Sequence, residues 1–95
     1  MSYDLHCLNR WRYRELKALC RQYAALRRRG DWRAAVILDC AKRADLADWQ
    51  AIIHNVGDGT SYERAASCQS MTQFYRSRAK FFTLLDEEME RRTRP

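Results

Sequence analysis

The chain has 95 residues, with 18 basic and 12 acidic side chains for a net charge of +6, and only three glycines and one proline. This length supports one domain, and so few turn-forming residues exclude a strand-rich fold, which needs a turn cluster between successive strands. We therefore expect one all-α domain over residues 1–95, with a basic surface that attracts nucleic acid, anionic membrane or an acidic protein surface.

The first predicted helix covers about residues 4–29, and Ser2 or Asp4 can cap its start. Its apolar residues recur at helical spacing and form a single face. They are Leu5, Leu8, Leu16, Leu19, Tyr23 and Leu26. We expect this face to be buried and the opposite face to be solvated.

The stretch RRRGDW from Arg27 to Trp32 contains the tripeptide Arg-Gly-Asp, which is an adhesion signal when it lies in an extracellular loop. Gly30 suits the left-handed position just past a helix end. Asp31 is a good N-cap for a helix that begins at Trp32. We therefore interpret this stretch as a corner between two helices and not as an adhesion loop.

Two shorter helices are predicted next, over about residues 32–44 and 46–56. The first of them is apolar on most sides, so it should be central and largely buried. Asp45 can cap the second, with Asp48 favourable in its first turn. This pair could be taken for a helix-turn-helix, but the segment 46–56 has no Arg or Lys to contact DNA.

A loop over about residues 55–63 leads to a long fourth helix, predicted over about residues 61–91. Thr60 and Glu63 match a capping box at its start. The order long, short, short, long favours a small antiparallel bundle of about four helices, with the two long helices side by side. Apolar area left around Tyr75, Phe82 and Met89 would provide a homodimer seam.

Five basic residues of the first helix fall within a window about 60° wide, opposite the apolar face. They are Arg10, Arg14, Lys17, Arg21 and Arg28. Solvated helix faces usually mix signs, because like charges at i,i+4 repel. This almost entirely positive stripe favours a negatively charged partner, and the alternative is an ordinary solvated face.

Arg12 and Arg78 each fall within the apolar arc of their own helix. A buried arginine needs a carboxylate partner, and otherwise the two arginines mark a face left open for a partner. The candidate carboxylates are Glu15, Asp39 and Asp86. Trp11 and Tyr13 flank Arg12, a combination typical of interface hot spots and of single-strand nucleic-acid platforms. The structural alternative packs these aromatics under the N-terminus or against the fourth helix.

The four cysteines show no metal-ligand spacing and are expected as small core residues. We expect Cys20 and Cys40 to be buried, Cys68 to border the core and Cys7 to be exposed. His54 near Asp58 suits a helix C-terminus. Because no phosphate loop, nucleophile elbow or catalytic triad is present, we expect no enzyme activity, catalytic residue, metal or cofactor.

The preferred function is a small interaction protein that binds an acidic surface of a larger protein and regulates or inhibits it, as accessory proteins of phages or bacteria do. The candidate partner-binding residues are Arg10, Trp11, Arg12, Tyr13, Arg14, Lys17, Arg21 and Arg28. The alternative is a nucleic-acid-binding protein whose first helix contacts phosphates with little sequence preference. No apolar run is long enough to span a membrane, and the polar N-terminus lacks a signal-peptide pattern, so we expect no membrane insertion and a cytoplasmic location.

Overall fold

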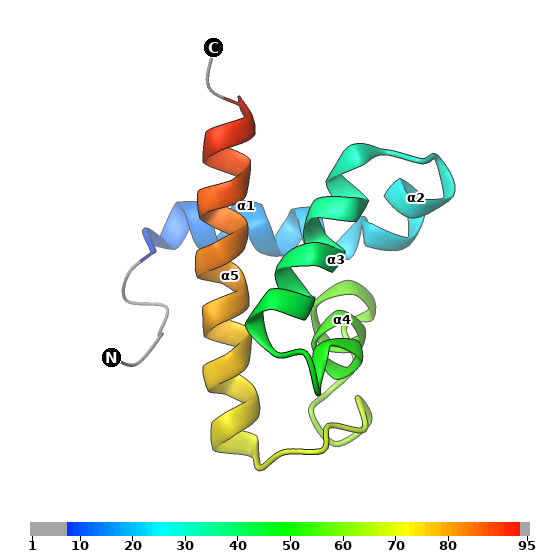
Figure 1. The fold of residues 1–95 in the computed structure, drawn as a ribbon, viewed down its shortest axis with the longest axis vertical. Coiled ribbons are helices and arrows are strands. Elements are labelled where there is room, and N and C mark those ends of the chain that lie inside the picture. Colours follow the sequence, from blue (N-terminus) through cyan, green and yellow to red (C-terminus); the bar gives the residue numbers. More distant parts are fainter. Residues whose placement is uncertain (1–7, 94–95) are drawn as a thin grey trace.

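The computed structural model describes residues 8–93, and this part of the chain contains helices and no strand (Figure 1). The helices are α1 (Arg10–Arg21), α2 (Tyr23–Arg28), α3 (Trp32–Ala44), α4 (Trp49–Asp58) and α5 (Met71–Thr93). The predicted all-α class is therefore confirmed. The expected caps Ser2 and Asp4 and the apolar Leu5 lie outside the described residues.

The first predicted helix is wrong in its extent, because the chain breaks at Gln22 into two helices. α1 begins after Asn9, whose side chain accepts a hydrogen bond from the Trp11 N–H at 2.7 Å. It ends at Arg21, and the next residue, Gln22, has a φ of −91° and a ψ of 2°. The break lets α2 turn against α3, and it leaves Tyr23 and Leu26 buried.

The corner between α2 and α3 forms as the sequence predicts. Gly30 has a φ of +69°, the left-handed conformation that favours glycine after a helix end. The Asp31 carboxylate caps α3 by accepting the Arg33 N–H at 3.0 Å. Hydrogen bonds from the Arg33 side chain and backbone hold the pKa of Asp31 well below its usual range. The Arg-Gly-Asp tripeptide therefore lies at a helix boundary, and α3 covers the predicted residues.

α4 begins at Trp49 and not at Leu46, because residues 45–48 form a turn. The Ala47 N–H donates to Asp45 Oδ1 at 3.1 Å, and the Asp48 N–H donates to the Asp45 carbonyl at 3.2 Å. Asp45 thus caps the turn before the helix and not the helix itself.

The predicted start of the last helix is also wrong, because α5 begins at Met71 and residues 61–70 form turns and bends. Asp48, from the turn before α4, is buried and binds residues of the 61–70 segment. It accepts hydrogen bonds from the Ser67 hydroxyl at 2.6 Å and from the Cys68 N–H at 3.1 Å. A helix through these residues would need the Cys68 N–H for its own backbone bond, so the tertiary contact overrides the capping-box pattern.

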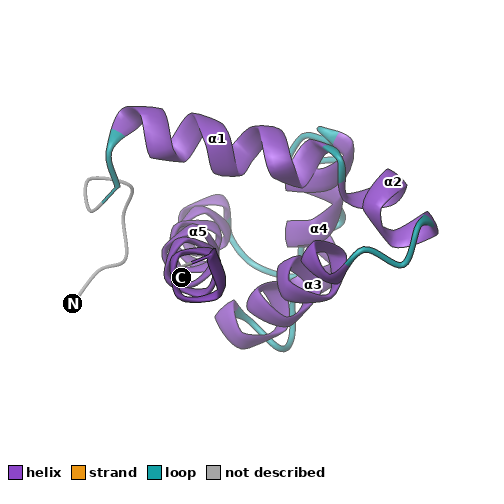
Figure 2. Cartoon of the chain, turned by 90° about the horizontal axis from the view of Figure 1, so that it is seen from above, coloured by secondary structure: helices purple, strands orange, loops and turns teal. Residues whose placement is uncertain are grey.

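α3 and α5 pack against each other as antiparallel neighbours (Figure 1). At one end, the Arg92 guanidinium lies 5.9 Å from the centroid of the Trp32 ring. At the other end, the Ser77 hydroxyl donates to Asp45 at 2.9 Å. α1 runs across α5 in both views (Figures 1 and 2), so a crossing replaces the predicted side-by-side packing of the first and last helices.

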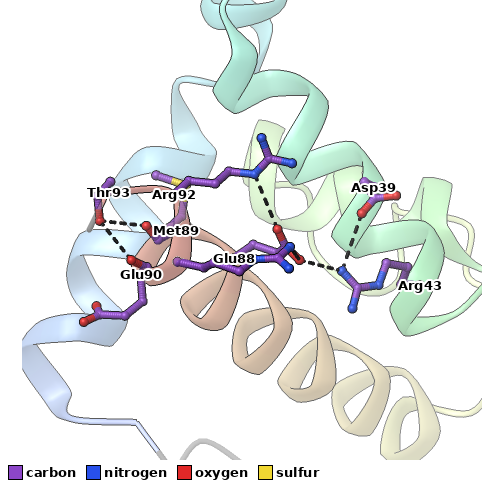
Figure 3. A network of polar contacts seen from close by, with 8 residues as sticks. Asp39, Arg43, Glu88, Met89, Glu90, Arg92 and Thr93 are labelled. Carbon is purple, nitrogen blue, oxygen red and sulfur yellow. Dashed lines mark hydrogen bonds and ion pairs between the residues drawn. The ribbon is translucent and has the colours of Figure 1, made fainter. Parts of the chain in front are cut away.

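An ion-pair cluster around Glu88 ties α3 to α5, and Figure 3 shows Glu88 facing Arg43 across the two helices. Glu88 Oε1 accepts hydrogen bonds from Arg43 Nη1 at 3.1 Å and from Arg91, and Oε2 accepts from Arg92 Nε at 3.4 Å. The Glu88 side chain is 11% exposed. Its hydrogen bond with Arg91, followed by those with Arg43 and Arg92, lowers the pKa of Glu88 to about 2.

The core takes apolar residues from all five helices. Phe82 has no exposed surface, so the predicted dimer seam is wrong in including it. Met89 is partly buried against the core, and Tyr75 is exposed. Over residues 8–93, none of the helices combines the length and the apolar character needed to cross a bilayer.

Candidate interaction face

The outward side of α1 carries four basic residues, which we call the basic face. Leu16 and Cys20 are buried on the inner side of this helix, and the helical period turns the basic residues to the opposite side. All four are exposed: Arg10, Arg14, Lys17 and Arg21. Within residues 8–93, none of them forms an ion pair.

Trp11 lies beside the basic face, and this residue is 67% exposed. The Arg14 guanidinium lies 5.2 Å from the centroid of the Trp11 ring, which is a cation–π contact. Exposed tryptophan and arginine are the residue types that dominate the energy of many protein interfaces. A partner that covers this ring would gain apolar burial in addition to charge pairing.

Arg12 and Tyr13 turn inward, away from the basic face. Arg12 Nε donates to Asp86 Oδ1 at 2.6 Å, and Arg12 Nη1 lies 3.8 Å from Glu15 Oε2. The predicted pairing of Arg12 with these carboxylates is confirmed. Tyr13 packs edge-on against Phe82 with ring centroids 5.1 Å apart. Both side chains therefore anchor α1 on α5.

Arg78 is held without a carboxylate, so its predicted ion pairing is wrong for the described part of the chain. Its Nε donates to Asn55 Oδ1 at 2.7 Å, and its Nη1 donates to the Tyr13 hydroxyl at 3.3 Å. The guanidinium also lies 4.9 Å from the centroid of the Phe82 ring. These neutral partners fix the position of Arg78 and leave its positive charge uncompensated.

Arg28 is separated from the basic face, because the break at Gln22 places it on α2. It lines an open groove of about 520 Å³ between α2 and α4. In the same groove, His54 Nδ1 lies 3.2 Å from Asp58 Oδ2, near the C-terminal end of α4 as predicted. The structure thus divides the candidate residues into three groups. The basic face and Trp11 point outward, Arg12 and Tyr13 point inward, and Arg28 lies apart on α2.

A smaller hollow lies beside the C-terminal half of α1 and includes residues that sequence reasoning did not single out as functional. Its volume is about 170 Å³. It is lined by Lys17, Arg21, Asn55, Val56, Gly59, Thr60, Ser61 and Arg78. The sequence predicts a loop around Gly59, but nothing in it places Gly59 beneath Arg21. We call this the α1–α4 hollow.

The described cysteines include two core thiols and one at the surface. Cys20 and Cys40 are buried as predicted, and Cys68, predicted to border the core, is exposed. Burial raises the pKa of Cys20 and of Cys40 to about 12, which keeps both thiols protonated at neutral pH. Cys7 lies outside the described residues. In the part of the chain that the structure covers, no three His, Cys, Asp or Glu side chains gather as a metal site requires.

Comparisons with protein-family models, with curated proteins and with solved structures found no match to this chain. The candidate face is therefore interpreted from its own geometry and charge.

Proposed function

We propose that this protein docks onto an acidic surface of a larger protein through the basic face and Trp11, and that it regulates or inhibits the protein that it covers. One observation carries the proposal: four exposed cations without acidic partners in the described chain stand next to an exposed tryptophan. Charge complementarity steers such an encounter, and the Trp11 and Arg14 pair supplies an anchor.

The charge pattern of α1 favours a partner with carboxylates. Arg10 and Arg14 stand four residues apart, as do Lys17 and Arg21, and like charges at this spacing destabilise a helix. Carboxylates brought by a partner would relieve this repulsion. Arginine suits the task because its planar fork binds a carboxylate through two parallel hydrogen bonds.

The basic face is also held in a fixed position before any partner arrives. The Arg12–Asp86 ion pair and the Tyr13–Phe82 contact fasten the inner side of α1 to α5. A surface that is already ordered loses less conformational entropy on binding. Arg12 and Tyr13 therefore support docking indirectly.

The test compares two double charge reversals that change the net charge equally. Arg10→Glu with Arg14→Glu alters the basic face, whereas Arg64→Glu with Arg76→Glu alters exposed arginines elsewhere. We expect the first variant to lose a protein partner captured by the wild-type chain, with affinity at least about tenfold weaker, because interface arginines are frequent hot spots. The second variant should retain the partner. Equal capture by both variants would contradict the proposal.

A nucleic-acid partner is distinguished by direct titration at two salt concentrations. We would titrate the protein into labelled single-stranded and duplex DNA and RNA at about 50 and 200 mM salt, because phosphate contacts weaken steeply with salt. Submicromolar binding to these strands would favour nucleic acid over a protein as the partner. This holds if the binding is lost at the higher salt concentration and in the Arg10→Glu, Arg14→Glu variant.

A further inference from the structure

The α1–α4 hollow brings together three cations from two helices that are far apart in the sequence. Lys17 and Arg21 stand one turn apart on α1, and Arg78 reaches the same hollow from α5. Thr60 and Ser61, from the connection between α4 and α5, add hydroxyl groups to the wall. A volume of about 170 Å³ accommodates one small group and not an extended chain.

The positive charge of the hollow is not neutralised by the described residues. No carboxylate lines it, and its three cations form no ion pair within residues 8–93. The C-terminal end of α4 contributes only about half of a negative charge. The hollow is therefore strongly electropositive.

A chain of contacts holds part of the wall in place. Lys17 Nζ lies 5.9 Å from the centroid of the Tyr13 ring, and the Tyr13 hydroxyl accepts a hydrogen bond from Arg78. Arg78 in turn donates to Asn55, whose side-chain amide donates to the Thr60 carbonyl at 2.9 Å. Two of the three cations are thus positioned by contacts that leave their charge available.

The third cation, Arg21, can occupy its place only because residue 59 is a glycine. Gly59 ends α4 with a φ of +74°, and the Arg21 guanidinium lies directly over it. A Cβ atom at Gly59 would stand 2.2 Å from Arg21 Nη1 and 2.7 Å from Arg21 Cζ. Any side chain at this position would therefore displace the guanidinium from its place.

We propose that this hollow binds a phosphomonoester group on a phosphorylated side chain of the partner protein. Such a group carries about 1.5 to 2 negative charges at neutral pH and three terminal oxygens, which suits three converging cations. A carboxylate or a phosphodiester brings one charge and two free oxygens, so it uses the site less completely. The inference rests on the proposed function, because Lys17 and Arg21 belong to the basic face as well.

The first experiment measures binding of inorganic phosphate to the full chain by NMR titration, with acetate and dimethyl phosphate as comparators at equal ionic strength. We expect phosphate to bind in the millimolar range, at least about tenfold more tightly than either comparator. Its affinity should fall as the pH is lowered from about 7.5 to 5.5, because phosphate, like a phosphomonoester, loses its second negative charge over this range. Equal binding of the three anions would overturn the proposal.

A matched pair of glycine variants tests the geometry at constant net charge. Gly59→Ala and Gly30→Ala both place alanine at a positive φ, but a Cβ at Gly30 meets nothing within 4 Å. Gly59→Ala should weaken phosphate binding about tenfold by displacing Arg21, which is the loss of one charge-assisted hydrogen bond. Gly30→Ala should bind as the wild type does, and equal weakening in both variants would contradict the assignment.

If Gly59→Ala does not fold, Arg21→Gln and Arg10→Gln make the same comparison, because Arg10 lies on the basic face outside the hollow. The expected result is weaker phosphate binding in Arg21→Gln alone. Equal binding by these two variants would overturn the proposal.

The proposed docking and the proposed phosphate site fail in different experiments. Loss of partner capture in Arg10→Glu, Arg14→Glu, with phosphate binding retained, supports both. Partner capture that survives phosphatase treatment of the partner overturns the phosphorylated side chain and leaves docking intact. Tighter binding of an oligonucleotide without terminal phosphate than of a phosphoserine peptide would overturn the monoester in favour of a nucleic-acid backbone.

Discussion

Glu88 illustrates how one carboxylate fixes the relative position of two helices. It is the common acceptor for Arg43 of α3 and for Arg91 and Arg92 of α5, and its pKa is lowered to about 2. A lowered carboxyl pKa contributes stability that is fully present above the ordinary value of 4.5 and is lost as the pH falls towards about 2. The α3–α5 contact is therefore acid-sensitive.

The substitution Glu88→Gln should lower the free energy of unfolding at neutral pH, because the arginines lose a charged acceptor. Between pH 4.5 and 2, the variant should lose less stability than the wild type. Urea denaturation across this pH range measures the difference. Glu87→Gln is the control, since Glu87 is an exposed neighbour. A variant whose pH dependence matches that of the wild type would show that the cluster is not responsible.

Two arginines, Arg12 and Arg78, show which side-chain contacts could be predicted from the sequence and which could not. Arg12 was expected to pair with one of three carboxylates, because a cation in an apolar arc needs an acidic partner, and the structure selects Asp86 and Glu15. The same reasoning failed for Arg78, which is satisfied by Asn55 and Tyr13. Those partners lie on two other helices, and no local pattern indicates that they meet.

At the scale of helices and turns, Asp48 holds the segment that leads into α5. Replacement of Asp48 by alanine would leave the Ser67 hydroxyl and the Cys68 N–H without their acceptor. We expect the free energy of unfolding to fall by about 1–3 kcal/mol. Residues 61–70 should also open more often, so trypsin should cleave after Arg64 faster than in the wild type.

Glu63→Ala is the matched control for Asp48→Ala, because Glu63 is the exposed acid of the capping-box pattern. Since that box does not start a helix here, the substitution should change stability by less than about 0.5 kcal/mol. A loss of more than about 1 kcal/mol would mean that the box stabilises the protein after all.

Helix boundaries were predicted well where local residues determine them. The start of α3 follows from Gly30 and Asp31, whose roles depend on the adjacent backbone. The turns over residues 61–70 were missed because hydrogen bonds to the distant Asp48 hold them. The break at Gln22 was missed because no side-chain cap marks it. Of the candidate site, the outward stripe on α1 was predictable from helical period, whereas the hollow at Gly59 depends on tertiary packing.

At the scale of the whole molecule, one aromatic side chain represents a large share of the stability. Phe81 is fully buried and packs against Phe82 with ring centroids 5.1 Å apart. We expect Phe81→Ala to lower the free energy of unfolding by about 3–5 kcal/mol. Because small domains are stable by only about 5–15 kcal/mol in total, the urea midpoint should fall strongly.

Met71→Ala is the corresponding control, since Met71 lies on the same helix and is 49% exposed. It should change stability by less than about 1 kcal/mol. Similar losses for the two variants would indicate that α5 is held by its surface contacts and not by the core.

Because two thiols are buried in the core, the rate at which the protein is chemically modified depends on how often the core opens. While the core is closed, Cys20 and Cys40 are protonated and shielded, so oxidants and alkylating agents do not reach them. Each opening of the core returns both thiols to their ordinary reactivity. A thiol that has been modified no longer fits the core, so the protein cannot refold. In an oxidising solution the protein would therefore lose its folded state irreversibly at the rate at which the core opens. A reductant would slow this loss without changing any contact in the folded state.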